Sequence, residues 1–248
     1  MVEAIQIAKQ LKGLPVKLVW TREDDMQAGW FRPAYYHKVR AGIDNQGNIT
    51  AWQQRVVGQS MMEGTFFQGF YIQNGIDNSS VEGSKELNYK VDNHRLELHT
   101  TTSKVPVLWW RSVGHIHNAF VKEVTVDKLA TLAKQDPIKF RLSKLKPKSR
   151  EAEVLQLVAE KAGWGKPLPE GWGKGVAIHK SFGTYVAQVA EISINSTGKF
   201  KVERVVCVVV CGVAVNPDVI EAQMQGGIGF GLGPILDSEI TLDRGAVE

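Results

Sequence analysis

The chain has 248 residues, of which 43% are hydrophobic and 23% charged, a composition typical of a globular protein with a substantial core. Its net charge of +4 is dispersed, and basic residues cluster only at 144–150. A nucleic-acid-binding face needs clustered basic residues with interleaved aromatics, so we expect no nucleic-acid partner. No uninterrupted apolar run reaches about 18 residues, so we expect no membrane span.

The N-terminal segment predicts a helix, a strand and a second helix. Apolar residues at helical spacing over residues 2–11 predict the first helix, which should end before Gly13. The apolar run at residues 15–20 predicts a short strand. Thr21 stands before an acidic run and is suited to cap the second helix.

Two later segments predict β-hairpins. Alternating strands at 35–43 and 49–57 are joined by Asn-Gln-Gly-Asn, a typical turn sequence. A similar pattern at 189–194 and 200–210 turns at Asn-Ser-Thr-Gly. The likeness of the two turns indicates either a weak internal duplication or two independent examples of a common hairpin.

The middle of the chain predicts a long loop followed by helices. Residues 60–92 are rich in Gly, Asn and Ser and carry several aromatics, which is typical of a functional loop. Residues 117–134 form an amphipathic pattern, and Asp136-Pro137 begins a second helix. A third helix is predicted over residues 151–162. Helices together with antiparallel hairpins predict an α+β fold class.

The two cysteines, Cys207 and Cys211, lie in a very apolar run. On a strand this spacing puts them on one face, about 13 Å apart, which is too far for a disulfide. We expect both to be buried free thiols. Two cysteines also cannot supply the four thiolates of a plant-type iron–sulfur cluster.

Arg111 follows a pair of tryptophans and precedes Gly114. A guanidinium presents a rigid fork of donors that suits oxo, carboxylate or phosphate groups, and neighbouring aromatics exclude water. The alternative for Arg111 is a surface salt bridge. Close by, His115 and His117 could form a metal pair, but no third ligand stands at a recognisable spacing.

Gln223 is the second candidate. Asn216 can cap a helix that has Pro217 at its first position, so residues 219–226 predict a helix with Gln223 and Gln225 on different faces. A glutamine amide offers both a donor and an acceptor. The glycines of residues 226–233 do not have dinucleotide-binding spacing, and close packing against a neighbour explains them better.

Together these segments resemble the molybdenum-binding subunit of the xanthine dehydrogenase and aldehyde oxidase family, in its isoquinoline 1-oxidoreductase beta-subunit branch. The resemblance covers most of the chain and is most specific at residues 109–142, 175–194 and 211–232. It implies that Arg111 borders the molybdenum pocket, that Gln223 lies against the pterin cofactor, and that Val113 lines the substrate funnel. It implies a structural role for His179 and assigns no catalytic residue or metal ligand to this chain.

The resemblance also implies a domain organisation and a set of partners. Residues 1–148 and 174–248 correspond to parts of two molybdopterin-binding sub-domains, with a helix and linker at 149–173. Enzymes of this family oxidise N-heteroaromatic or aldehyde substrates with water as the oxygen source. Their cofactor is molybdopterin, either in its simple form or as the cytosine dinucleotide. A small 2Fe–2S subunit would carry the iron–sulfur clusters, and an acceptor such as a cytochrome would take the electrons.

Three family motifs are absent from these residues. The catalytic glutamate of the family stands in a Gly-x-Gly-Glu motif, which this sequence lacks, as it lacks the Gly-Gly-x-Phe-Gly and Gly-Gln-Gly motifs. The sequence also begins within a predicted helix, so we expect an internal fragment that is inactive alone. The alternative is a cofactor-free scaffold or small-aromatic-binding domain that kept the fold. The sequence is compatible with a periplasmic and with a cytoplasmic location.

Overall fold

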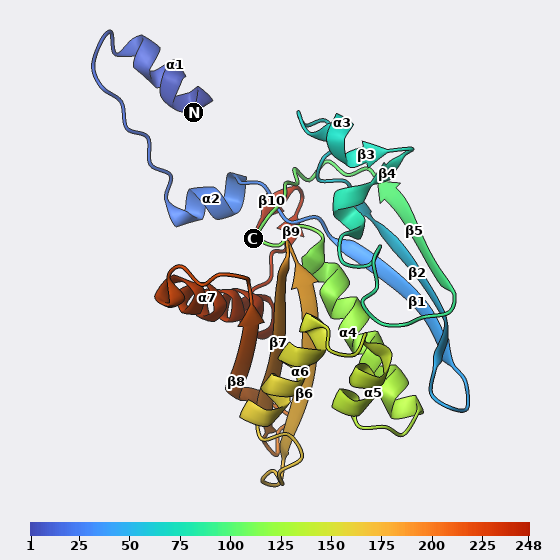
Figure 1. Ribbon diagram of the computed structural model, residues 1–248. Helices are drawn as coiled ribbons and strands as arrows, with labels where there is room; N and C mark the ends of the chain where they lie inside the picture. Colours follow the sequence, from blue (N-terminus) through green and yellow to red (C-terminus); the bar gives the residue numbers. More distant parts are fainter. The chain divides into compact units, whose positions relative to one another are not determined.

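The computed structural model describes all 248 residues, which form two compact units (Figure 1). One unit contains Met1–Phe31 and Gly226–Glu248, and the other contains Arg32–Gln225. The boundary at residue 226 falls within helix α7 (Pro217–Leu236). No helix is both long and apolar enough to cross a membrane.

The smaller unit has little regular structure. It contains α1 (Val2–Gln10), α2 (Arg22–Ala28) and a two-stranded ribbon of β9 (Leu242–Asp243) and β10 (Ala246–Val247). The predicted capping at Thr21 is confirmed, because its side chain accepts a hydrogen bond from the backbone of Asp24. The predicted strand at residues 15–20 is wrong: no neighbouring segment supplies backbone partners there.

The first sheet of the larger unit has the order β1-β2-β5. Its strands are β1 (Tyr35–Ile43), β2 (Ile49–Gln59) and β5 (His94–Thr101). The predicted hairpin is confirmed, and its turn is closed by Asp44, whose Oδ1 accepts from the backbone of Gln46 and Asn48. β5 was not predicted; it pairs in parallel with β2.

The second sheet is an antiparallel meander of β6 (Trp172–Ser181), β7 (Thr184–Ile194) and β8 (Phe200–Val210). The second predicted hairpin is therefore confirmed. The third strand of the first sheet is parallel, whereas all pairs of the second sheet are antiparallel. The likeness of the two hairpins thus does not extend to the whole sheets.

The segment between β2 and β5 is packed more tightly than its loop-like sequence indicates. It contains α3 (Gln68–Tyr71), the strands β3 (Ile72–Gln73) and β4 (Ile76–Asp77), and a short 3-10 helix, η1 (Asn78–Val81). The buried carboxylate of Asp77 accepts hydrogen bonds from the hydroxyls of Ser60 and Ser79, both at 2.6 Å. These bonds satisfy polar groups that burial would otherwise leave without partners.

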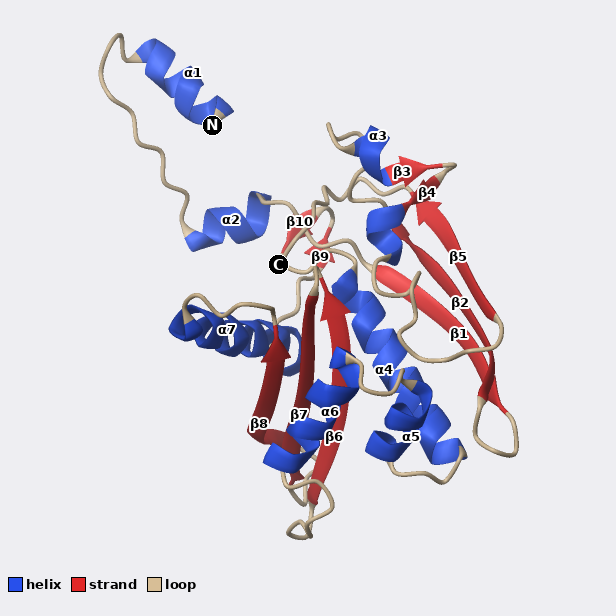
Figure 2. Cartoon of the chain, in the orientation of Figure 1, coloured by secondary structure: helices blue, strands red, loops and turns tan.

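Three helices complete the larger unit: α4 (His115–Leu132), α5 (Pro137–Lys144) and α6 (Arg150–Lys161). Asp136 caps α5, as the sequence predicts, and Ser149 caps α6. Figure 2 shows α4 between the two sheets, where it contacts β1 and β6, while α6 packs on β7 and β8. The predicted α+β class is confirmed.

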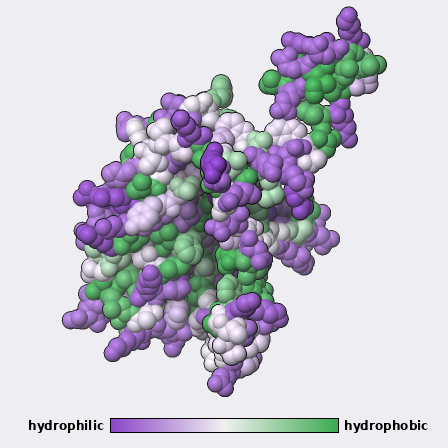
Figure 3. All heavy atoms as spheres, turned by 180° about the vertical axis from the view of Figure 1, so that it is seen from behind, coloured by the Kyte–Doolittle hydropathy of each residue, from purple (hydrophilic) through white to green (hydrophobic).

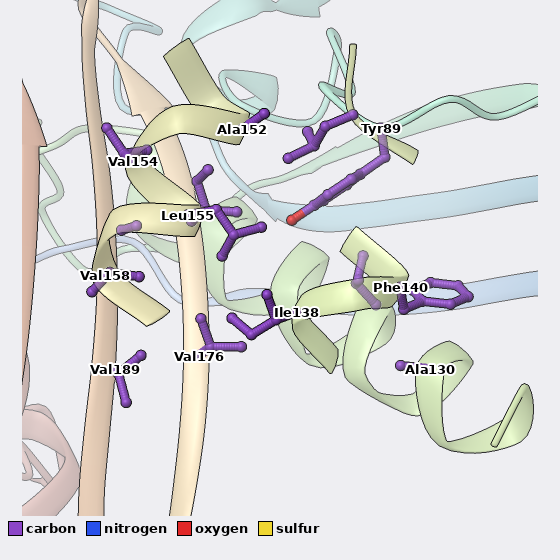
Figure 4. Close-up of a cluster of buried hydrophobic side chains, with 14 of the residues drawn as sticks. Tyr89, Ala130, Ile138, Phe140, Ala152, Val154, Leu155, Val158, Val176 and Val189 are labelled. Atoms are coloured by element: carbon purple, nitrogen blue, oxygen red, sulfur yellow. The ribbon is translucent and has the colours of Figure 1, made fainter. Parts of the chain in front are cut away.

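The core lies where α4, α5 and α6 meet the two sheets, and it includes Ile49 and Trp52 of β2. Figure 4 shows Leu155 and Val158 of α6 directed toward Val176 and Val189 of the strands. Arg141 is buried beside this core: it is fully shielded from solvent and contacts the carboxylates of Glu123 at 3.0 Å and Asp127 at 2.7 Å. The hydroxyl of Tyr89 donates to the same Glu123 carboxylate at 2.9 Å.

Candidate functional site

The two predicted cofactor residues are in contact. Arg111 lies in the loop before α4, and Gln223 lies on α7. The Nη2 of Arg111 donates to the backbone oxygen of Gln223 at 3.0 Å and to its Oε1 at 3.3 Å. Both residues are exposed. The amide nitrogen of Gln225 donates to the carboxylate of Glu221 at 2.8 Å, so the two glutamines of this helix have different partners.

The loop that carries Arg111 has an unusual backbone. Ser112 and Val113 have positive φ angles of 69° and 49°, a region that non-glycine residues rarely adopt and that is concentrated at functional sites. The backbone nitrogen of Val113 bonds to Trp110 at 2.9 Å. A second arginine, Arg32, donates to the backbone oxygen of Arg111 at 3.1 Å. The loop is therefore fixed by a turn of its own and by the contact with Arg32.

Gly114 anchors the end of this loop. A Cβ at this position would lie 1.8 Å from the backbone oxygen of Ser79 and 3.4 Å from the Cβ of Glu82. Only glycine permits this approach of the loop to the η1 segment. Val113, the predicted substrate-side residue, is half-buried in the same loop, and its role stays a prediction.

A chain of hydrogen bonds that the sequence does not reveal ends at His117. The amide nitrogen of Gln54 lies 3.2 Å from Nδ1 of His37, and it also donates to Oγ of Ser84 at 3.0 Å and to Oδ1 of Asn118 at 3.1 Å. Nε2 of His37 lies 2.8 Å from Nδ1 of His117. Nε2 of His117 is buried and has no partner.

The environment of His117 keeps it neutral. Its ring stacks on Tyr35 with the centroids 3.9 Å apart. Burial, followed by the nearby His37 and Arg32, lowers the pKa of His117 to about 3. A buried imidazole nitrogen without a partner marks a place where a polar group of a ligand can bind.

His115 belongs to a separate chain of bonds. Lys122 donates from Nζ to Nδ1 of His179 at 3.0 Å, so His179 carries its proton on Nε2 and donates it to Nδ1 of His115 at 2.9 Å. Burial, followed by Lys122, lowers the pKa of His179 to about 2. His115 and His117 thus bond to different histidines, and no group of three or more metal-ligating side chains is present.

Two expectations about α7 and the cysteines are corrected. The glycines of residues 226–233 lie within α7, which runs on to Leu236, and not in a segment after the helix. Cys207 is half-buried, and burial raises the pKa of its thiol. Cys211 is exposed, contrary to expectation, because β8 ends at Val210 and the residue lies beyond the strand. Both thiols are free.

Comparison with known proteins gives two family matches that together span almost the whole chain. Residues 2–145 match the model of one molybdopterin cofactor-binding domain. Residues 113–247 match the model of a second molybdopterin cofactor-binding domain. Arg111 falls within the first match, Gln223 within the second, and Val113 within both.

Curated relatives are similar over the same range. The chain is 31% identical over 254 residues to the isoquinoline 1-oxidoreductase beta subunit of Brevundimonas diminuta, covering 100% of this chain and 32% of that protein. It is 30% identical over 268 residues to the membrane-bound aldehyde dehydrogenase (pyrroloquinoline-quinone) of Gluconacetobacter polyoxogenes, covering 95% and 34%. The chain thus spans about a third of the length of these relatives.

Solved structures share the fold. The aldehyde oxidoreductase of Desulfovibrio gigas has a TM-score of 0.52 at 19% identity, covering 79% of this chain and 23% of that chain. Quinoline 2-oxidoreductase from Pseudomonas putida 86 has a TM-score of 0.53 at 16% identity, covering 79% and 29%.

Proposed function

Because the chain belongs to the family of molybdopterin cofactor-binding domains, we propose that it supplies part of the cofactor pocket of a longer molybdenum-dependent oxidoreductase. The observation that carries this proposal is the contact between Arg111 and Gln223, which are 112 residues apart in sequence. These are the two residues that the sequence resemblance assigns to the cofactor. In the structure they meet at one place.

The donors at this place fit molybdopterin. A guanidinium with five N–H groups suits the phosphate and the polar ring edge of a pterin. Because Oε1 of Gln223 accepts from Arg111 at 3.3 Å, the amide nitrogen of Gln223 points away from Arg111 as a second donor. Nε2 of His117 is buried and has no partner, and Arg32 contacts the Arg111 backbone and also lowers the pKa of His117. A polar group of a bound cofactor would satisfy this nitrogen.

In this proposal the chain binds and orients the cofactor and does not supply the proton-abstracting base. When bound, molybdopterin supplies the metal that carries out the oxidation. The chain's own contribution is the Arg111–Gln223 pair on the cofactor and Val113 on the substrate side. By analogy with the names of its relatives, the substrate is an N-heteroaromatic compound or an aldehyde. The sequence resemblance implies water as the oxygen source.

We propose that the electrons leave through partner proteins. The two cysteines of this chain are too few for an iron–sulfur cluster. A 2Fe–2S subunit followed by an acceptor such as a cytochrome therefore completes the proposal. Val213 and Val215, between β8 and α7, are 88% and 91% exposed. Figure 3 shows hydrophobic residues interspersed with hydrophilic ones on one face of the molecule.

The deciding experiment is elemental and pterin analysis of the native protein that contains this chain. We expect about one molybdenum per chain by mass spectrometry, together with a fluorescent pterin after oxidative release. A purified, folded native protein without molybdenum or pterin would contradict the proposal. That result would favour the cofactor-free alternative.

A further inference from the structure

We propose that a cavity beside α4 is a binding site for a small carboxylate, separate from the Arg111–Gln223 contact. The cavity has a volume of about 510 Å³. Its lining combines the segment before β5, the first turns of α4, and the β6–β7 turn. The residues that carry the argument are Glu82, Asn88, His115, Lys122, His179 and Phe182.

The first observation is the buried amine of Lys122, which has no carboxylate within ion-pair distance; burial lowers its pKa, and the charges of Glu123 and Glu151 act against that shift. Lys122 is only 2% exposed, and its Nζ bonds to Oδ1 of Asn88 and to Nδ1 of His179, both at 3.0 Å. Its neighbour Glu123 is engaged by Arg141 at 3.0 Å, so it does not form an ion pair with Lys122. A buried charge is costly unless it is paired, and an ammonium has three donors, of which these bonds use two. The cavity therefore offers a site for an anion.

The second observation is an unsatisfied donor beside this ammonium. Lys122 can only donate, so it fixes the Asn88 amide with Oδ1 toward Nζ. The Nδ2 of Asn88 is then left buried and has no partner. Two donors of adjacent side chains thus lack acceptors in one cavity. The two oxygens of a carboxylate match this pair.

The remaining lining groups define the body of the ligand. Lys122 fixes the tautomers of His179 and then His115, so the free Nε2 of His115 is a third donor. The Oε2 of Glu82 is buried without a partner and can accept from an O–H or N–H of the ligand. The ring of Phe182 is 73% exposed and flanks His115 with the centroids 5.2 Å apart. These groups fit a carboxylate on a flat apolar ring that also bears one donor.

The test is calorimetric titration of the native protein that contains this chain with 4-hydroxybenzoate and with its neutral analogue 4-hydroxybenzamide. We expect binding of the acid and at least about tenfold weaker binding of the amide, since charge-assisted hydrogen bonds are the stronger ones. Lys122→Met should weaken binding of the acid by about tenfold or more. The matched control is Lys128→Met, on the exposed side of the same helix, which should bind like the wild type.

A second variant keeps the test decisive if Lys122→Met does not fold. Asn88→Asp places a carboxylate next to Lys122, so it should fold and lose affinity for the acid by about tenfold or more. Absence of binding by the wild type at millimolar 4-hydroxybenzoate would overturn the proposal. Equal binding of acid and amide would also overturn it, as would unchanged affinity in folded Asn88→Asp. The proposal of cofactor binding is unaffected by these outcomes, because it depends on other residues.

Discussion

The guanidinium of Arg111 donates from one nitrogen to two oxygens of Gln223, the backbone oxygen at 3.0 Å and Oε1 at 3.3 Å. This contact joins the loop before α4 to the first half of α7. It also orients the Gln223 amide, because the oxygen is directed toward the arginine. A change at Arg111 is therefore expected to affect both side chains, and we expect the two positions to act as a unit rather than independently.

Gly114→Ala should destabilise the chain and displace the Arg111 loop. The added Cβ would be 1.8 Å from the backbone oxygen of Ser79, a contact that only backbone movement can relieve. We expect a loss of at least about 2 kcal/mol in the free energy of unfolding, measured by denaturant titration. Gly229→Ala is the control, since it lies in α7 with nothing near its Cβ and should be neutral or slightly stabilising. Equal stabilities of the two variants would contradict the tight approach.

Arg141→Ala should be among the most destabilising single substitutions. Arg141 is fully buried and neutralises Glu123, so its removal leaves a buried carboxylate without a counter-charge. Breaking such a pair costs about 3–5 kcal/mol. The control is Arg95→Ala, whose side chain is 73% exposed in its ion pair and whose loss should cost about 1 kcal/mol or less. Similar unfolding midpoints for the two variants would be inconsistent with a buried ion pair.

The stability should decrease as the pH falls below about 6.5. Burial lowers the pKa of His117 to about 3 and that of His179 to about 2, whereas an unfolded histidine has a pKa near 6.5. Between these values the unfolded chain binds protons that the folded chain does not. Each histidine therefore lowers the free energy of unfolding by about 1.4 kcal/mol per pH unit as the pH falls.

The measurement is denaturant unfolding at pH 7, 6 and 5 for the wild type and His117→Gln. Glutamine cannot be protonated at this position. The free energy of unfolding of the variant should therefore fall with pH less steeply than that of the wild type, the slopes differing by about 1.4 kcal/mol per pH unit. Proton NMR of the folded wild type should show these two imidazoles unchanged over this range. An identical pH slope for the variant would contradict the neutral, buried state of His117.

The two thiols should differ in reactivity. Cys211 is exposed, whereas burial raises the pKa of Cys207 and lowers its thiolate fraction. Iodoacetamide at pH 8 should therefore label Cys211 first in the native chain, as followed by mass spectrometry. Cys211→Ser should leave only a slow phase, and the fast phase should persist in Cys207→Ser. A fast phase that disappears in Cys207→Ser instead would refute this assignment.

Local signals were enough to predict most of the fold. The turns at residues 45–48 and 195–198, the caps at Thr21, Asp136 and Asn216, and the apolar spacing of α4 each act within a few residues. The strand β5 was missed because its partner β2 lies far back in the chain and Arg95, Glu97 and His99 give it no continuous apolar pattern. The strand predicted at residues 15–20 failed for the converse reason, since strand propensity without a partner does not form a strand.

The candidate site was only partly predictable. The sequence resembles the xanthine dehydrogenase and aldehyde oxidase family, and the family matches confirm this resemblance. Arg111 and Gln223 were named separately, but their direct contact follows from the fold. The chains of bonds through His37 and His117, and through Lys122 and His179, join residues that are far apart in sequence. No local pattern marks such contacts. The sub-domain limits at residues 148 and 174 stay predictions.

The most direct test of the proposed cofactor contact is the molybdenum and pterin content of Arg111→Ala in the native protein that contains this chain. Arg55→Ala, on the exposed side of β2, is the matched control. We predict that Arg111→Ala loses bound molybdenum and pterin by at least about tenfold while its thermal midpoint stays unchanged. The control should keep full occupancy. Full molybdenum and pterin occupancy in folded Arg111→Ala would contradict the account.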